Sequence, residues 1–447
     1  MSKSMKALQS STRRAFALGF ALTFLFGGGV ASAQPTPDRF VSFSEFVQAV
    51  RSATLSKYGS APDVRVGSVG AFDEMRRHVL EIYDSVHVTH SYMLDSQYFD
   101  CVPIIEQPSA RQLGLTSIDT TPPSLPQPAG RNTGRAGEAP AVQVAVGQKS
   151  DQFGNRIPCE SGTIPFRRIT LEELARFKTL RDFFKKRPDG LDQGRAAATH
   201  KYADAYQDVA NHGGGQFINL WDPAVNTGLT HIFSLAQHWF SNYRSDGKVQ
   251  TAEGGWQDYP GKYGVTKPVL FIYWTADGYN ATGCYNLDCK GFVQTNPNVH
   301  LGAGFSNYST QGGTQYFIEV HWFLSGGKWW FYLGGVDAAH AVGYYPASLY
   351  ASGPLATRGS EIDYGGETVG TTNWPQMGGG RFPNTGFGHA AYQRTIHYYT
   401  TGNGYDNATL TPSQPSPSCY KIKLFNNSSN TTYRTYFYFG GPGGTGC

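Results

Sequence analysis

The chain has 447 residues, a net charge of +4 and only 16% charged residues, so its charge is small for its size. No run of basic residues interrupts this balance, which argues against nucleic acid as a partner. Aromatic residues make up 14% of the chain and 54 residues are glycine, a composition typical of a β-rich protein with many turns. The length predicts two or three units, each able to bury a core.

Residues 1–33 have the features of an export signal. A basic start leads to an apolar stretch over residues 15–30 and then to "ASA" at 31–33, a small-residue cleavage site. We therefore expect removal before Gln34 and a secreted protein, or a periplasmic one if the host is bacterial. The apolar stretch is short and interrupted by glycine, which disfavours a membrane anchor. The pair Arg13-Arg14 fits a twin-arginine signal, and an ordinary secretory signal fits equally well.

Six cysteines follow the predicted signal, and an even number in an exported protein favours disulfides over metal ligation or a cysteine nucleophile. The sequence "CYNLDC" predicts a tight local loop, the last two cysteines would clip the C-terminal segment, and the first two remain for the front half. The favoured pairs are Cys284–Cys289, Cys419–Cys447 and Cys101–Cys159.

Residues 34–195 have a mixed α and β pattern. "VSFSEFVQAVRS" contains Ser42 three residues before Glu45, the pattern of a capping box, and "AFDEMRRHVLEIY" repeats the helical spacing of apolar residues. "SVHVTHSYM" alternates and predicts a strand. Thr170 and Glu173 form a second capping box, which predicts a helix to about Phe184.

Two stretches in this front half have the composition of exposed segments. Residues 108–148 are rich in Pro, Gly, Ala and Arg, which predicts a flexible linker. "KRPDGLDQGR", over residues 186–195, is rich in helix breakers and is the kind of segment that proteases cut.

Residues 196–447 consist of short aromatic and β-branched runs separated by Gly, Asn, Asp or Pro, without a sustained helical period. The fold class that we expect is all-β, an antiparallel β-sandwich preceded by a small α+β region. A smaller front unit followed by cleavable segments and a large domain is the usual arrangement of a pro-segment.

Most catalytic chemistries lack their motif in this chain. His87 and His90 are three residues apart on a predicted strand, so their rings would not converge, and His389 and His397 are isolated. There is no HExxH motif, no paired CxxC motif and no GxSxG motif. We therefore expect no metal, no cofactor and no serine nucleophile.

Two glutamates have an unusual context. Glu253 lies in "AEGGWQ" and Glu367 in "IDYGGETVG", each beside a glycine pair with an aromatic residue nearby. Glycine allows backbone or ligand to approach a carboxylate closely. Glutamate is usually solvated, so by context alone a surface position is the more ordinary interpretation for each of them.

Longer motifs resemble the neprosin family in order and spacing. They are "EGGWQDYPGKYG", "FIYWTADGYNATGCYNLDCKGFVQTN", "IDYGGE" and "PQMGGGRFPNTGFGHAAYQR", with "CESGTIPFRRIT" and "YFDCVPIIEQPSAR" resembling the family's activation peptide. The resemblance covers roughly residues 99–447, linkers excepted. It implies a secreted glutamic endopeptidase that is made as a zymogen, works at acid pH and cuts after proline.

The resemblance also implies that Glu253 and Glu367 are the catalytic pair. Two carboxylates held close together titrate apart, so one can act as acid and the other as base, and which glutamate is the base stays open. A proline subsite needs flat apolar surfaces, and the candidates for substrate binding are Trp256, Tyr273, Trp274, Gln294 and Tyr364. The aromatic candidates could equally pack the core.

One departure bears on specificity. The better-known plant members usually have Glu-Trp-Gly-Gly-Glu where this chain has Asp363-Tyr364-Gly365-Gly366-Glu367. We expect proline-containing peptides as substrates and the front region bound to the catalytic domain before activation. A glycoside hydrolase, or a carbohydrate-binding sandwich without activity, remains as an alternative.

Overall fold

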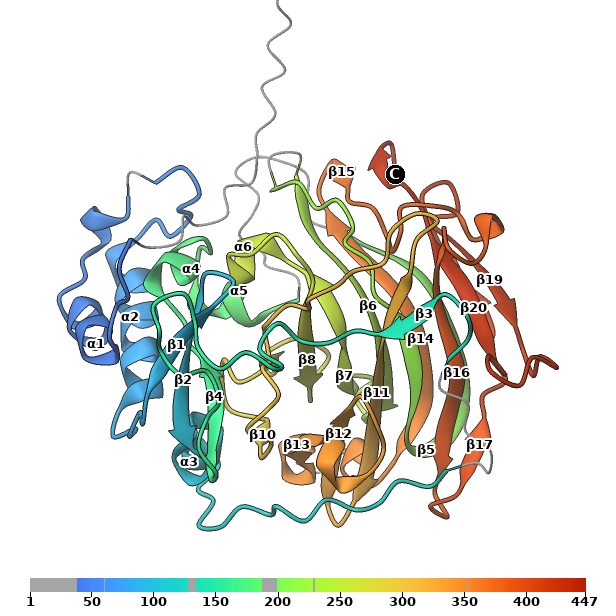
Figure 1. Ribbon diagram of the computed structural model, residues 1–447, viewed down its shortest axis with the longest axis horizontal. Helices are drawn as coiled ribbons and strands as arrows, with labels where there is room; N and C mark the ends of the chain where they lie inside the picture. Colours follow the sequence, from blue (N-terminus) through green and yellow to red (C-terminus); the bar gives the residue numbers. More distant parts are fainter. Residues whose placement is uncertain (1–37, 60, 128–133, 187–198, 228–229, 352) are drawn as a thin grey trace, which may run out of the picture.

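The computed structural model describes residues 38–59, 61–127, 134–186, 199–227, 230–351 and 353–447. The predicted export signal and the stretch 187–195 lie outside these residues. Within the described ranges, every helix is too short or too polar to cross a membrane. Figure 1 shows a small N-terminal region of helices and short strands packed against one side of a large, strongly curled sheet.

The N-terminal region is α+β, as predicted. Its strands β1 (Ser91–Leu94), β2 (Gln97–Pro103) and β4 (Thr163–Arg167) form an antiparallel sheet in that order. Its helices are α1 (Phe43–Arg51), η1 (Leu55–Lys57), α2 (Val69–Tyr83), η2 (Ile104–Glu106), α3 (Pro108–Gln112), α4 (Leu171–Ala175) and α5 (Leu180–Phe184). Both predicted capping boxes form, at the starts of α1 and α4. The single helix expected after Thr170 is two short helices, α4 and α5.

The described parts of residues 108–148, expected to be a flexible linker, pack on the β domain. Apolar side chains of residues 113–125 cover a cluster that includes Phe323, Trp330 and Tyr332. Farther along, β3 (Glu138–Pro140) pairs in parallel with the start of β11 (Gln315–Ser325). The few apolar residues of this stretch thus bury their surface against the sheet, and this burial cannot be predicted from composition alone.

The β domain is built from one continuous sheet and a few short elements. Its remaining strands are β5 (Thr199–Asn219), β6 (His231–Tyr243), β7 (Val249–Asp258), β8 (Val269–Thr275), β9 (Cys284–Tyr285), β10 (Val293–Gln294), β12 (Lys328–Leu333), β13 (Ala341–Pro346), β14 (Gly359–Gly370), β15 (Asn373–Trp374), β16 (Ala391–Thr400), β17 (Tyr405–Asn407), β18 (Thr411–Ser413), β19 (Lys421–Phe425), β20 (Tyr436–Gly440) and β21 (Gly444–Thr445). Its short helices are α6 (Pro260–Tyr263), η4 (Ala338–His340), η5 (Ala347–Tyr350), η6 (Pro354–Ala356) and η7 (Pro383–Thr385).

The long strand β5 joins two layers. Its first half lies between β14 and β18, and its second half lies between β11 and β16. From the first half the sheet continues as β14-β6-β7-β8-β9, and from the second half as β11-β12-β13-β10. The layers face each other, since a side chain added at Gly254 on β7 would meet Phe331 and Trp322 of the other layer. The all-β prediction is confirmed.

All six cysteines form disulfides, in the same pairs that the sequence favoured: Cys101–Cys159, Cys284–Cys289 and Cys419–Cys447.

Candidate active site

Strand register places Glu253 and Glu367 on one face of the sheet. Glu253 on β7 lies opposite Trp239 on β6, and Glu367 on β14 lies opposite Leu235 on β6. Side chains alternate between faces with a period of two, so Leu235 and Trp239 point to the same side, and the two glutamates point with them. We call this side the glutamate face; the other side of these strands faces the sandwich core.

The glycine pairs beside the glutamates are required by packing. A Cβ atom at Gly255 would lie 2.1 Å from the carbonyl oxygen of Ala236, and one at Gly366 would lie 2.6 Å from the ring of Phe439. Larger residues would therefore push the strands or the core apart. The glycine pairs beside the glutamates are thus explained, at least in part, by close packing of neighbouring strands and core side chains.

One lysine side chain bridges the two glutamates. Lys186 Nζ lies 2.5 Å from Glu253 Oε2 and 3.2 Å from Glu367 Oε2. The three side chains are at most 4% exposed, so this is a buried cluster of one cation and two carboxylates. Because both distances meet at one nitrogen, the two carboxylates lie close to each other.

Lys186 comes from the N-terminal region, two residues after α5 ends. Its ammonium group lies within 6 Å of the ring centroids of Trp239, Phe271 and Tyr273, all on the glutamate face. Its surroundings are therefore aromatic as well as acidic. Sequence reasoning did not single out Lys186, because a lysine before a breaker-rich segment has no distinguishing pattern.

The two glutamates differ in their other hydrogen-bond partners. Glu367 Oε1 lies 2.5 Å from Nδ1 of His200, and Glu367 Oε2 accepts from the Gln237 amide at 3.4 Å. Glu253 Oε1 instead accepts from two hydroxyl groups, Thr251 at 2.6 Å and Tyr279 at 2.8 Å. One glutamate thus faces a histidine and an amide, and the other faces only hydroxyls.

These contacts perturb the titration of the cluster. Burial alone would raise the pKa of Glu367, but the charge of Lys186 and the hydrogen bond with His200 outweigh it and hold the pKa at about 2. Burial likewise opposes the charge of Lys186, yet the two carboxylates hold the pKa of Lys186 above its ordinary value. The lysine and Glu367 are therefore a charged pair in neutral solution.

Two further carboxyl groups, those of Asp204 and Asp363, lie on the glutamate face near Glu367. Asp204 on β5 lies opposite Gly365, and Asp363 is four residues before Glu367 on the same strand. Burial, with the charge of Glu367 adding to it, raises the pKa of Asp204 to about 7. Burial and the charge of Asp204 raise the pKa of Asp363 well above its ordinary value.

Of the five residues proposed for substrate binding, the structure brings Tyr273 to the glutamates. Tyr273 lies opposite Glu253 on β8 and contacts Lys186. Trp256 points to the core, where its indole nitrogen donates to the carbonyl oxygen of Asn219 at 3.0 Å. Trp274 also packs in the core, against Tyr345 and Tyr350.

The other two candidates are also away from the pair. The Tyr364 hydroxyl donates to the carbonyl oxygen of His397 at 2.8 Å, on the core side of β14. The Gln294 amide donates to the carbonyl oxygen of Val299 at 2.6 Å. Alternation along a strand explains these positions, because the residue next to a glutamate-face residue points into the core. The aromatic residues that sequence reasoning missed on the glutamate face are Trp239, Phe271 and Tyr279.

The histidines considered as metal ligands lie in separate places. His90 contacts Cys101 and His389 contacts Gln311, whereas His397 is buried near His321. Across the described part of the chain, no group of three or more His, Cys, Asp or Glu residues is arranged to hold a metal ion.

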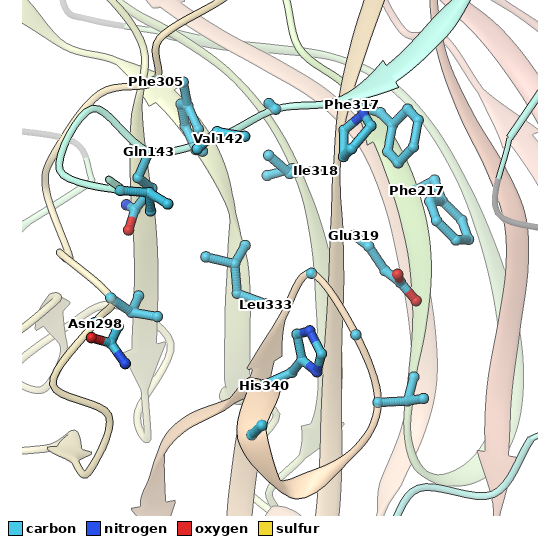
Figure 2. A pocket seen from close by; sticks show the side chains of 18 of the residues that line it. Val142, Gln143, Phe217, Asn298, Phe305, Phe317, Ile318, Glu319, Leu333 and His340 are labelled. Carbon is cyan, nitrogen blue, oxygen red and sulfur yellow. The ribbon is translucent and has the colours of Figure 1, made fainter. Parts of the chain in front are cut away.

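A separate cavity of about 620 Å³ lies between β11, β12 and the segment around β3. Figure 2 shows its mostly apolar wall, with Ile318, Leu333 and Phe305, and the polar groups of Glu319 and His340. Neither Glu253 nor Glu367 lines it. It is therefore distinct from the site on the glutamate face.

The chain is similar to known proteins over part of its length. A solved structure of scytalido-glutamic peptidase with a transition-state-analogue inhibitor is similar to 54% of this chain and 98% of its own, at 7% identity and a TM-score of 0.29, a likeness too weak to bear on function. The Neprosin family model matches residues 230–442, a range that includes both glutamates. Over these residues the match agrees with the resemblance seen in the sequence.

Proposed function

We propose that this protein is a glutamic endopeptidase in which Glu253 and Glu367 activate water for peptide hydrolysis. The observation that carries the proposal is the single Lys186 ammonium group shared by both carboxylates. Groups that hold one cation between them are close enough to hold one water molecule between them. The neprosin match supports a peptidase with protein or peptide substrates.

The chemistry follows from the proximity of the carboxyl groups. When two such groups share a site, one ionises more readily than the other, so one proton stays on the pair over an acid pH range. The ionised group can remove a proton from water while the protonated group donates to the peptide carbonyl. We therefore expect activity in acid solution.

We propose further that the N-terminal region, residues 34–195, is a pro-segment of a secreted zymogen. Lys186 occupies the space between the glutamates that water and the peptide bond would need. A cut between about residues 160 and 200 would separate this region from the catalytic domain, residues 196–447. The three disulfides support an oxidising, extracytoplasmic location.

The proposed preference for proline fits the surroundings of Lys186. The rings of Trp239, Phe271 and Tyr273 lie around the lysine. Once the lysine leaves, these faces become available to a flat apolar ring such as that of proline.

Substitution of each glutamate tests the function. The wild type, Glu253→Gln and Glu367→Gln would be incubated with a denatured, proline-containing protein near pH 3 and pH 7, and the cuts mapped by mass spectrometry. We expect cuts after proline in acid by the wild type, and a loss of about 100-fold or more in each variant, because each removes the acid or the base.

The matched control is Asp246→Asn, which removes an exposed carboxylate in the turn after β6. This variant should cleave like the wild type. If either glutamine variant retains near-wild-type activity, the catalytic pair is wrongly assigned. If the self-processed wild type cuts a polysaccharide and no protein, the glycoside hydrolase replaces the peptidase.

A further inference from the structure

We propose that His200 is a positioning residue that keeps Glu367 ionised in acid solution, so that Glu367 is the base and Glu253 the acid. This inference rests on the proposed peptidase function and assigns the roles within its catalytic pair. Neither the neprosin match nor the strand register distinguishes the two glutamates.

The fold holds the His200 ring against the Glu367 carboxylate. His200 lies near the start of β5, two residues before Tyr202, which lies opposite Glu367. The imidazole stacks on the Tyr202 ring at 6.1 Å, and the edge of Phe233 meets it at 6.3 Å. These contacts support the ring in the place where Nδ1 is 2.5 Å from Glu367 Oε1.

Departure of Lys186 would make the two glutamates unequal. Glu367 would keep His200 on one oxygen and the Gln237 amide on the other. Glu253 would keep the Thr251 and Tyr279 hydroxyls on one oxygen, while its other oxygen would lose the lysine.

These donor sets favour opposite protonation states. Histidine side chains are cations in acid solution, and a cation beside a carboxylate favours the ionised form. Hydroxyl groups can donate or accept, so they tolerate a protonated carboxyl group equally well. The proton that the pair shares should therefore reside on Glu253.

The other groups that face Glu367 do not reverse this order. They are Tyr202 and Asp204 from β5, Glu253 from β7, Tyr273 from β8, Tyr279 after β8 and Asp363 from β14, besides Lys186, His200 and Gln237. Burial raises the pKa of all three tyrosines, so they are uncharged in acid. The raised pKa values of Asp204 and Asp363 leave both groups uncharged in acid, so they add little repulsion to an ionised Glu367.

The assigned roles give a balanced reaction. The Glu367 carboxylate takes a proton from water as the water oxygen bonds to the peptide carbon, and Glu253 gives its proton to the carbonyl oxygen. Glu367 then passes its proton to the amide nitrogen as the C–N bond breaks. Glu253 recovers a proton from a hydroxyl group as the new carboxyl group forms, so both residues return to their starting states.

The test is the pH profile of kcat for the acid-activated enzyme, with His200→Gln and His200→Lys. Loss of the cation should shift the acid limb of His200→Gln upward by about one pH unit or more, so that the rate at the acid end falls about tenfold. His200→Lys restores a positive charge and should move the limb back toward the wild type. His212→Gln, on the same strand but hydrogen-bonded to Asn403, is the matched control and should leave the profile unchanged.

An unchanged acid limb in His200→Gln, with only a uniformly lower rate, would overturn the positioning role. The proposed peptidase function would survive that result, because it fails only if the glutamate variants stay active. A second measurement needs no histidine variant. In wild type labelled with carbon-13 glutamate, the Glu253 carboxyl should titrate at higher pH than that of Glu367, and the reverse order would contradict the assignment.

Discussion

Two buried charge clusters join the N-terminal region to the β domain, and they differ in how their charges are divided. In the anchor cluster, Arg167 pairs with Glu173 at 2.7 Å, while Lys262 pairs with Asp288 at 2.8 Å. Arg167 also approaches Asp288 at 3.9 Å across the boundary. Each side therefore brings one cation and one anion.

The blocking cluster has a different division. The N-terminal region brings only the cation, Lys186, and the β domain brings both carboxylates, Glu253 and Glu367. If the two regions separate, each half of the anchor cluster keeps a neutral pair. The β-domain half of the blocking cluster keeps two carboxylates and stays negative even with His200 charged. If the proposed zymogen is correct, acid relieves only that half, and we expect the anchor to serve attachment and the blocking cluster to respond to protons.

Removal of Lys186 should have the largest effect, because it tests directly whether this lysine blocks the two glutamates. Lys186→Met leaves two buried carboxylates without their cation, and breaking a buried ion pair costs about 3–5 kcal/mol. The equilibrium between the blocked and the open state should therefore shift toward the open state by at least about 100-fold. We expect the wild type to cleave a small peptide only after a lag on mild acidification, and the variant to cleave it without that lag.

The control is Arg181→Met, which removes an exposed cation from α5, the helix just before Lys186. Its lag should match that of the wild type. An equal lag in Lys186→Met would mean that the lysine does not block the site.

Breaking the anchor should have a different consequence. Arg167→Met removes the hydrogen-bonded cation of Glu173 and leaves Lys262 and the more distant Arg176 to offset two buried carboxylates, so the fold should lose about 3 kcal/mol of stability. Calorimetry should show a lower Tm in neutral solution. Arg156→Met, which breaks a pair with Glu160 in which both side chains are exposed, should change stability by less than about 1 kcal/mol. Equal losses in the two variants would remove the distinction between anchor and surface pair.

Much of this arrangement could be predicted from local sequence. The capping boxes at Ser42 and Thr170 depend on residues three apart, and both form. The glutamates were found through long motifs, and strand alternation then places them on one face. These features depend on short-range spacing, which a single sequence displays directly.

The missed features depend on contacts between distant segments. Lys186 meets Glu367 across 181 positions, and no local pattern marks it. Trp256 is adjacent to the Gly-Gly motif, yet strand alternation turns it into the core, where it bonds with Asn219. Sequence proximity to a site residue therefore does not mean proximity in space when the segment is a strand.

The smallest expected effect is the pH dependence with which the N-terminal region docks on the β domain, which should differ between the two clusters. With the lysine in place, the pKa of Glu367 is held at about 2, below the ordinary value of 4.5. His200 stays on Glu367 when Lys186 leaves, so the pKa of Glu367 in the open site lies between about 2 and 4.5; this contribution to docking is fully present above the open-site pKa and is lost as the pH falls toward 2. One proton is involved, so docking should weaken by up to about tenfold, or 1.4 kcal/mol, for each pH unit in that window.

The anchor cluster should not follow the same trend, because burial raises the pKa of Glu173 and protonation of this group does not weaken docking. Hydrogen exchange read by mass spectrometry at low temperature, corrected for the intrinsic pH dependence of exchange, measures both places in one sample. Protection of α5, beside Lys186, should fall as the pH drops below 4.5 toward 2, while β2 and β4 near the anchor keep theirs. In Lys186→Met the fall at α5 should disappear. A parallel loss of protection in α5, β2 and β4 would show that acid opens the whole boundary together, and that the division of charge between the clusters does not direct the release.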